Sequence, residues 1–94
     1  MRISNLLTKQ HDLKILESFA GDVFCGYKTF EVRKNDRGFQ KGDTVTFTCI
    51  DKEGTVIPHG IDTITYEITY VLSGWGIKEG YVVFGIREMQ RQVE

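Results

Sequence analysis

The sequence has little proline, little cysteine and no long apolar run, and each scarcity excludes a class of protein. One proline and two cysteines occur in 94 residues, too few for a proline-rich disordered chain or for a small domain built on several disulfides. Apolar stretches such as YVVFGI are far shorter than the roughly 20 residues of a transmembrane helix, and MRISNLLTKQH lacks a secretory apolar run. We therefore expect one globular domain, residues 1–94, in the cytoplasm and with no membrane partner.

An excess of basic charge is also missing. The chain has 12 basic and 13 acidic residues and a net charge of −1, whereas proteins that coat nucleic acid without specificity usually carry a basic stripe. The charge is uneven, because residues 28–41 contain five basic and two acidic side chains. A local basic rim suits a compact anionic ligand or a short stretch of nucleic acid better than a long duplex.

Metal-binding residue types are few and scattered. The sequence contains no C-x-x-C motif and no histidine-cysteine spacing of the kind that binds zinc. His11 and His59 have no acidic or cysteine partner at ligand spacing. We predict no metal and no cofactor, and we place both histidines at the surface or in loops.

Hydrophobic periodicity predicts one helix and about five strands. Helical spacing relates Leu16, Phe19, Ala20, Val23 and Phe24, and the glycine at position 26 is placed to end a helix over 17–25. Strands are expected in HDLKIL, KTFEVRK, TVTFTCI, TITYEITYVL and YVVFGIRE. These elements predict a mainly β (α+β) domain, a small, mostly antiparallel and partly closed β-barrel with one helix packed against it.

Period-two patterns also predict which side chains face the core. Phe30 and Val32 alternate with polar neighbours in KTFEVRK, so we expect them to pack inward while Glu31 and its neighbours at 29 and 33 share a free face. In the longest predicted strand, Tyr66 and Tyr70 share the apolar face. Both are expected in the core.

Four residues carry a resemblance to a known family. Gly26, Lys28, Glu31 and Arg33 match G-x-K-x-x-E-x-R, the hallmark of the ASCH superfamily, whose members are relatives of the PUA domain. The stretches KNDRGFQKGD and YVLSGWGIKEGYVVFGI strengthen the match. Over residues 11–88 the sequence resembles a small single-domain branch that occurs in bacteria and phages and is described as RNA-binding. The resemblance implies a PUA-like β-barrel with a polar cleft beside the helix.

The resemblance also implies a partner, single-stranded RNA or a modified nucleotide. An arginine fork suits a phosphate or a base edge, and a glutamate can accept from an exocyclic amine. A loop tryptophan can stack on an unpaired base. The predicted ligand-binding residues are Lys28, Thr29, Glu31, Arg33, Lys34, Arg37 and Trp75.

Each of these residues also has a structural explanation. Glu31 and Arg33 can pair with cross-strand neighbours, because alternating charge is common on open sheet faces. The cations of the turn that follows are typical of solvated positions. Trp75, between two glycines, can cap the end of the barrel instead of stacking on a base.

Two other functions stay open. Some ASCH proteins are small amidohydrolases that deacetylate N4-acetylcytidine with the motif lysine, a threonine at the motif's glutamate position and a glutamate from a helical insert. Lys28 matches the lysine, but Glu31 replaces the threonine and only SGWGIKEG stands where the insert would be, which makes Glu79 a poor substitute. Binding is expected ahead of catalysis, and Lys28 and Glu31 are the catalytic candidates if the protein is an enzyme. The third function is a protein-interaction module of a phage or bacterium, with a monomer as the default state.

Overall fold

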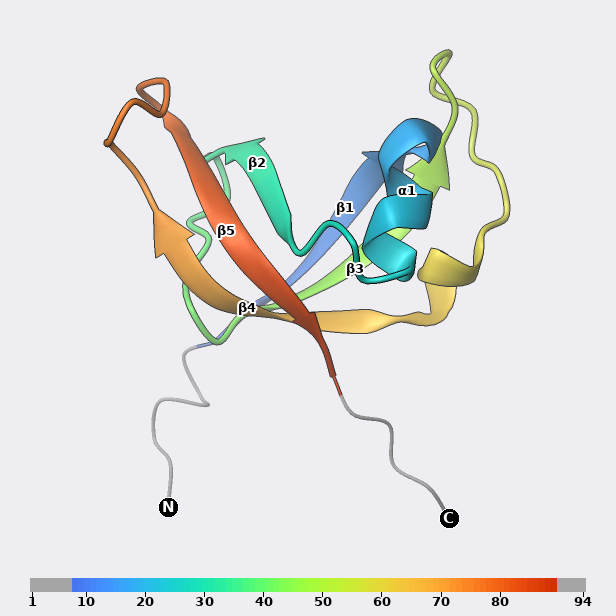
Figure 1. Ribbon diagram of the computed structural model, residues 1–94, viewed down its shortest axis with the longest axis horizontal. Helices are drawn as coiled ribbons and strands as arrows, with labels where there is room; N and C mark the ends of the chain where they lie inside the picture. Colours follow the sequence, from blue (N-terminus) through green and yellow to red (C-terminus); the bar gives the residue numbers. More distant parts are fainter. Residues whose placement is uncertain (1–7, 90–94) are drawn as a thin grey trace.

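The structure, a computed structural model, describes residues 8–89, in which one α-helix packs on a five-stranded curled sheet, a half-barrel (Figure 1). The mainly β class, the single α-helix and the five strands of the sequence prediction are confirmed. In chain order the elements are β1 (Gln10–Leu16), α1 (Glu17–Phe24), β2 (Phe30–Lys34), β3 (Thr44–Ile50), the 3-10 helix η2 (Gly60–Thr63), β4 (Thr65–Leu72) and β5 (Tyr81–Glu88).

The strand order, β1-β3-β4-β5-β2, places β1 and β2 at the two edges of the sheet. The pairs β3–β4, β4–β5 and β5–β2 are antiparallel and β1–β3 is parallel, so the sheet is mostly antiparallel, as predicted. Arg33 Nη2 on β2 donates to the Lys14 carbonyl oxygen on β1 at 2.8 Å. The curl therefore brings the two edge strands close together across an open seam.

Helix α1 covers one end of the concave side of the sheet (Figure 1). It contacts β1, β3 and η2 and buries Ala20 and Val23. Gly26, at φ +83°, ends it as predicted: its N–H donates to the Val23 carbonyl and the Tyr27 N–H donates to the Asp22 carbonyl, a Schellman arrangement that only glycine adopts without strain. Neither helix in the described region is long and apolar enough to cross a membrane.

The prediction for β2 was wrong about which face is buried. Val32 is 53% exposed and Phe30 is also exposed, whereas Glu31 is only 4% exposed. Glu31 lies opposite Phe84, which belongs to the core. Because β2 is an edge strand, its inward face meets the seam rather than the centre of the core, and a charged side chain with partners is accommodated there.

A β-bulge changes the exposed face of β4 halfway along the strand. Tyr66 is buried in the core, as predicted, but Tyr70 is exposed. The pairing with β5 shifts register between Ile68 and Tyr70, and one additional residue moves all later side chains to the opposite face. Val71 consequently packs against the core in place of Tyr70.

His11 and Asp43 form a buried polar pair, which corrects the expected surface position of that histidine. His11 Nε2 lies 2.8 Å from Asp43 Oδ2, and both side chains are buried. The Asp43 carboxylate also accepts from the backbone N–H groups of Lys9 and Gln40, at 3.1 and 3.0 Å. The parallel β1–β3 pairing brings the two residues together although they are far apart in sequence. His59 lies in the loop before η2, as predicted.

Candidate functional site

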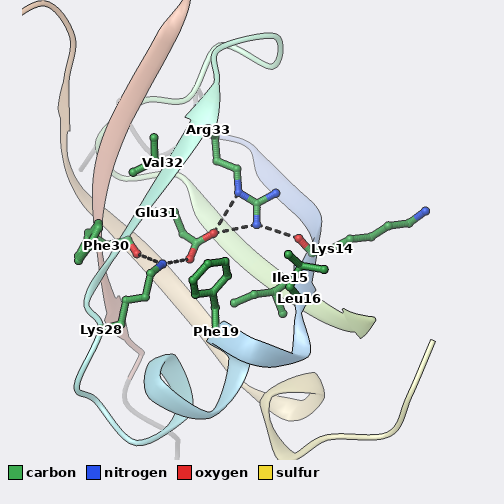
Figure 2. A pocket seen from close by; sticks show the side chains of 9 residues that line it. All are labelled: Lys14, Ile15, Leu16, Phe19, Lys28, Phe30, Glu31, Val32 and Arg33. Carbon is green, nitrogen blue, oxygen red and sulfur yellow. Dashed lines mark hydrogen bonds and ion pairs between the residues drawn. The ribbon is translucent and has the colours of Figure 1, made fainter. Parts of the chain in front are cut away.

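A pocket of about 490 Å³ opens where the end of β1, the start of α1 and β2 meet. Because it lies between the two edge strands, we call it the seam pocket (Figure 2). Its lining residues are Lys14, Ile15, Leu16, Phe19, Lys28, Phe30, Glu31, Val32 and Arg33.

A compact ionic cluster forms the polar wall of the seam pocket. Figure 2 shows the Glu31 carboxylate between Lys28 and Arg33. Glu31 Oε2 accepts from Lys28 Nζ at 2.7 Å, and Glu31 Oε1 accepts from Arg33 Nε and Nη2 at 3.0 and 2.7 Å. Two cations around one carboxylate leave the cluster with a net charge of +1.

The same cations also bind carbonyl groups of the edge strands. Lys28 Nζ donates to the Phe30 carbonyl of β2 at 2.7 Å, and Arg33 Nη2 donates to the Lys14 carbonyl of β1 at 2.8 Å. Farther along the seam, Arg37 Nη1 donates to the Asp12 carbonyl at 3.2 Å. Side chains that occupy edge carbonyls hinder the addition of another strand. Part of the charge in residues 28–41 therefore has a structural use, which the sequence left open.

Aromatic and aliphatic side chains form the other wall of the seam pocket. Leu16 and Phe19 remain exposed although they belong to the predicted apolar face of the helix. Lys28 Nζ lies 5.2 Å from the centre of the Phe19 ring and 4.8 Å from that of Phe30. The helical spacing in the sequence placed both residues on one apolar face but did not indicate a pocket wall; the signal was an apolar stripe wider than so short a helix can bury.

The polar wall has unused donors and few unused acceptors. Arginine has five N–H donors and lysine three; among residues 8–89, no group accepts from Arg33 Nη1, and Lys28 Nζ uses only two partners. Both oxygens of Glu31 are already engaged, and this side chain is buried. A ligand that enters the seam pocket is therefore met by hydrogen-bond donors and by positive charge.

The charged residues among the predicted ligand residues separate into two groups in the structure. Lys28, Glu31 and Arg33 line the seam pocket together. Lys34 and Arg37 are exposed and lie outside the pocket lining. The structure thus brings together the three charged residues of the motif, and their contact with a ligand remains a prediction.

Trp75 lies apart from the seam pocket. Its side chain is 89% exposed, so it does not cap the end of the sheet, and no residue of the fully described loop 73–80 lines the seam pocket. The prediction that Trp75 binds the same ligand as Lys28, Glu31 and Arg33 therefore has no support in the lining of the seam pocket. Trp75 has a φ of +56° between two glycines of positive φ, a rare conformation for a bulky residue.

A second pocket, of about 290 Å³, lies beyond the C-terminal end of α1, and we call it the helix-end pocket. Lys28 lines both pockets, and Thr29, the remaining predicted ligand residue, lines only this one. The lining residues of the helix-end pocket are Val23, Phe24, Cys25, Gly26, Lys28, Thr29, Tyr66, Ile86, Arg87 and Glu88.

Comparison with known families assigns the chain to a family but gives no activity for it. Residues 10–86 match the family described as a domain of unknown function, DUF3850. The chain belongs to this family. The match runs from the first residue of β1 into β5 and contains every residue of the seam pocket. No curated protein matches the chain significantly.

The Tyr66 hydroxyl is an unpartnered polar group. It is buried, and no group within residues 8–89 forms a hydrogen bond with it. Burial, and secondly the charge of Glu88, raises the pKa of Tyr66 to about 12. The neutral hydroxyl is therefore the form present in the folded protein near neutral pH.

We expect Tyr66→Phe to raise the free energy of unfolding by about 1 kcal/mol at pH 7, because a buried polar group without a partner costs roughly 1–3 kcal/mol. The difference should widen above pH 10. The tyrosine of the unfolded chain ionises at its ordinary pKa of 10.0 and that of the folded protein only at a pKa of about 12, so the wild type loses stability as the pH rises above 10, by on the order of 1 kcal/mol at pH 11. Urea unfolding at pH 7 and pH 11 measures both effects.

Tyr70→Phe is the matched control, because Tyr70 is on the same strand but exposed. Its stability should equal that of the wild type at pH 7. A Tyr66→Phe variant that is less stable than the wild type at pH 7 would show that the hydroxyl has a bonding partner.

Proposed function

We propose that the seam pocket binds single-stranded RNA or a modified nucleotide. The observation that carries the proposal is the positive cluster with unused donors beside exposed aromatic and aliphatic side chains. Small-molecule sites combine an apolar wall with a few placed polar groups in this way. The resemblance of Gly26, Lys28, Glu31 and Arg33 to the ASCH motif supports the same function, and kinship with that superfamily is part of the proposal.

The unused donors of Arg33 and Lys28 indicate how the ligand would be oriented in the seam pocket. A phosphate or a carbonyl edge would accept from Arg33 Nη1 and from Lys28 Nζ, since charge-assisted bonds to arginine are among the strongest in proteins. The base would lie against Phe19. Glu31 is then a positioning residue that holds the two cations, rather than the acceptor for an exocyclic amine that the sequence suggested.

The geometry supports binding better than amidohydrolysis. A general base has to accept a proton, and Lys28 Nζ serves as a donor to both Glu31 and the Phe30 carbonyl. Glu79, the sequence candidate for a second carboxylate, lies in the loop before β5 and lines neither pocket of the described region. Protein interaction is the other candidate function, and the exposed Val32 and Tyr70 on the sheet favour it.

We expect Arg33→Ala to weaken the binding of short single-stranded RNA by roughly 1–3 kcal/mol, because the variant loses the guanidinium donors. Few phosphates can be neutralised by one such cluster, so the slope of log K against log salt should be shallow, about −2 to −4. Fluorescence titrations at two salt concentrations measure both quantities.

Lys41→Ala is the control, because Lys41 is an exposed cation of the same stretch that lies outside both pockets. It should cost well under 1 kcal/mol. Equal losses for the two variants, with a steep salt slope, would mean that the charges form only a diffuse basic surface. If the wild type binds no RNA or nucleotide at all, the proposal fails and protein interaction becomes the better candidate.

A further inference from the structure

The two pockets are neighbours that share one cation. Lys28 follows the turn that ends α1 and lines both the seam pocket and the helix-end pocket. Its Nζ donates to Glu31 and to the Phe30 carbonyl, which fixes the ammonium group at 2.7 Å from each acceptor. If one ligand occupied both pockets, the fixed ammonium group of Lys28 would lie beside the point where its two parts join.

One lining residue of the helix-end pocket, Tyr66, carries a buried polar group that lacks a partner among the described residues. Tyr66 is only 4% exposed and is one of the lining residues, and no group in the described part of the chain bonds its hydroxyl. Tyr66 lies opposite Glu88 in the β4–β5 pairing. The negative charge of Glu88 adds to the effect of burial in raising the pKa of the Tyr66 hydroxyl. Buried polar atoms in native proteins nearly always have a partner. The hydroxyl is closed to solvent in this structure, so a ligand group that accepts a hydrogen bond would supply the partner only if the side chains around Tyr66 shift when the ligand binds.

The other walls indicate what the ligand group is. Val23, Ile86 and the exposed Phe24 provide apolar surface for a ring, and Thr29 adds a polar residue to the lining. Arg87 is paired with Glu67 at 2.8 Å, so the carboxylate of Glu88 is not neutralised by it. A second phosphate would be repelled there, whereas a neutral nucleoside would not. The volume of about 290 Å³ lies at the lower end of the range for small-molecule sites, about 300–1,000 Å³.

We propose that the helix-end pocket is a second nucleoside subsite, so that the ligand of this protein is at least a dinucleotide. One nucleotide occupies the seam pocket, the linking phosphate lies at Lys28, and the neighbouring nucleoside accepts a hydrogen bond from the Tyr66 hydroxyl. This inference rests on the proposed function and extends it from one nucleotide to a short strand.

The test compares ligands of two lengths. The four ribonucleoside 5′-monophosphates and the four corresponding homodinucleotides are titrated into the wild type, Tyr66→Phe and Tyr70→Phe, with Arg33→Ala as the seam-pocket variant. In the wild type the best dinucleotide should bind about tenfold more tightly than its mononucleotide. Tyr66→Phe should reduce that advantage by about three- to tenfold, the effect of one hydrogen bond. Tyr70→Phe should leave it intact.

NMR shift mapping gives a second readout that a merely structural role of Tyr66 would not produce. The amide signals of Thr29 and Ile86 should shift with the dinucleotide and not with the mononucleotide. Mononucleotide binding that depends on Arg33, without a dinucleotide advantage or with one that Tyr66→Phe leaves unchanged, overturns the second subsite and leaves the proposed function standing. Absence of binding by both ligand lengths overturns both.

Discussion

Replacing Asp43 with alanine is expected to lower the free energy of unfolding by about 3–5 kcal/mol, the range for removal of one partner from a buried polar network. The carboxylate accepts from two backbone N–H groups, those of Lys9 and Gln40, and contacts His11 Nε2 at 2.8 Å. All three groups would lose their partner at a site that water does not reach, since Asp43 is only 2% exposed. Urea unfolding followed by circular dichroism measures the loss.

Asp51→Ala is the matched control for this experiment. Asp51 also accepts from two backbone N–H groups, those of Glu53 and Thr55, at 2.9 and 2.8 Å. These bonds are exposed, so water replaces the carboxylate and the expected loss is about 1 kcal/mol or less. Similar losses for Asp43→Ala and Asp51→Ala would contradict the importance of burial at Asp43.

Replacing Glu31 with alanine should lower the free energy of unfolding by about 2–4 kcal/mol. The variant leaves Lys28 and Arg33 without their shared anion, and both cations remain mostly buried, at 20% and 24% side-chain exposure. The like charges then face each other across the cavity that the glutamate occupied. The loss should be smaller at high salt, because ions screen the repulsion between the two cations.

The exposed pair Glu67–Arg87 provides the comparison for Glu31. Both glutamates are on strands and bond an arginine at nearly the same distance, 2.7 and 2.8 Å, but their side-chain exposures are 5% and 37%. Glu67→Ala should therefore cost less than about 1 kcal/mol. If Glu31→Ala is equally mild, the seam cluster contributes little to stability and its charges are free to serve a ligand.

Local patterns in the sequence were sufficient to predict the α-helix and the strands, but not the 3-10 helix η2. The helical spacing from Leu16 to Phe24 and the period-two strands correspond to α1 and to the five strands of the sheet. Gly26 was recognised as the end of the helix because a left-handed residue is required there. Each of these features depends on neighbours within a few residues.

Properties that depend on the sheet as a whole were not predictable in the same way. Alternation showed that Phe30 and Val32 share a face, but only the edge position of β2 decides that this face is exposed. The bulge beyond Ile68 breaks the period without a glycine or proline on β4 itself; the glycine that makes room for it, Gly85, lies on the partner strand, where a Cβ would collide with the Thr69 hydroxyl. His11 meets Asp43 through the parallel pairing of β1 with β3, and no spacing along the chain indicates that contact.

The strand order bears on the stage of folding at which the seam pocket forms. Among the described strands, β2 pairs only with β5, although β3 and β4 lie between these two strands in the sequence. Pairing over so long a stretch of chain is slow compared with local folding. We therefore expect the seam between β1 and β2 to close late in folding, and a ligand that binds across it would stabilise the folded molecules and not the nascent ones.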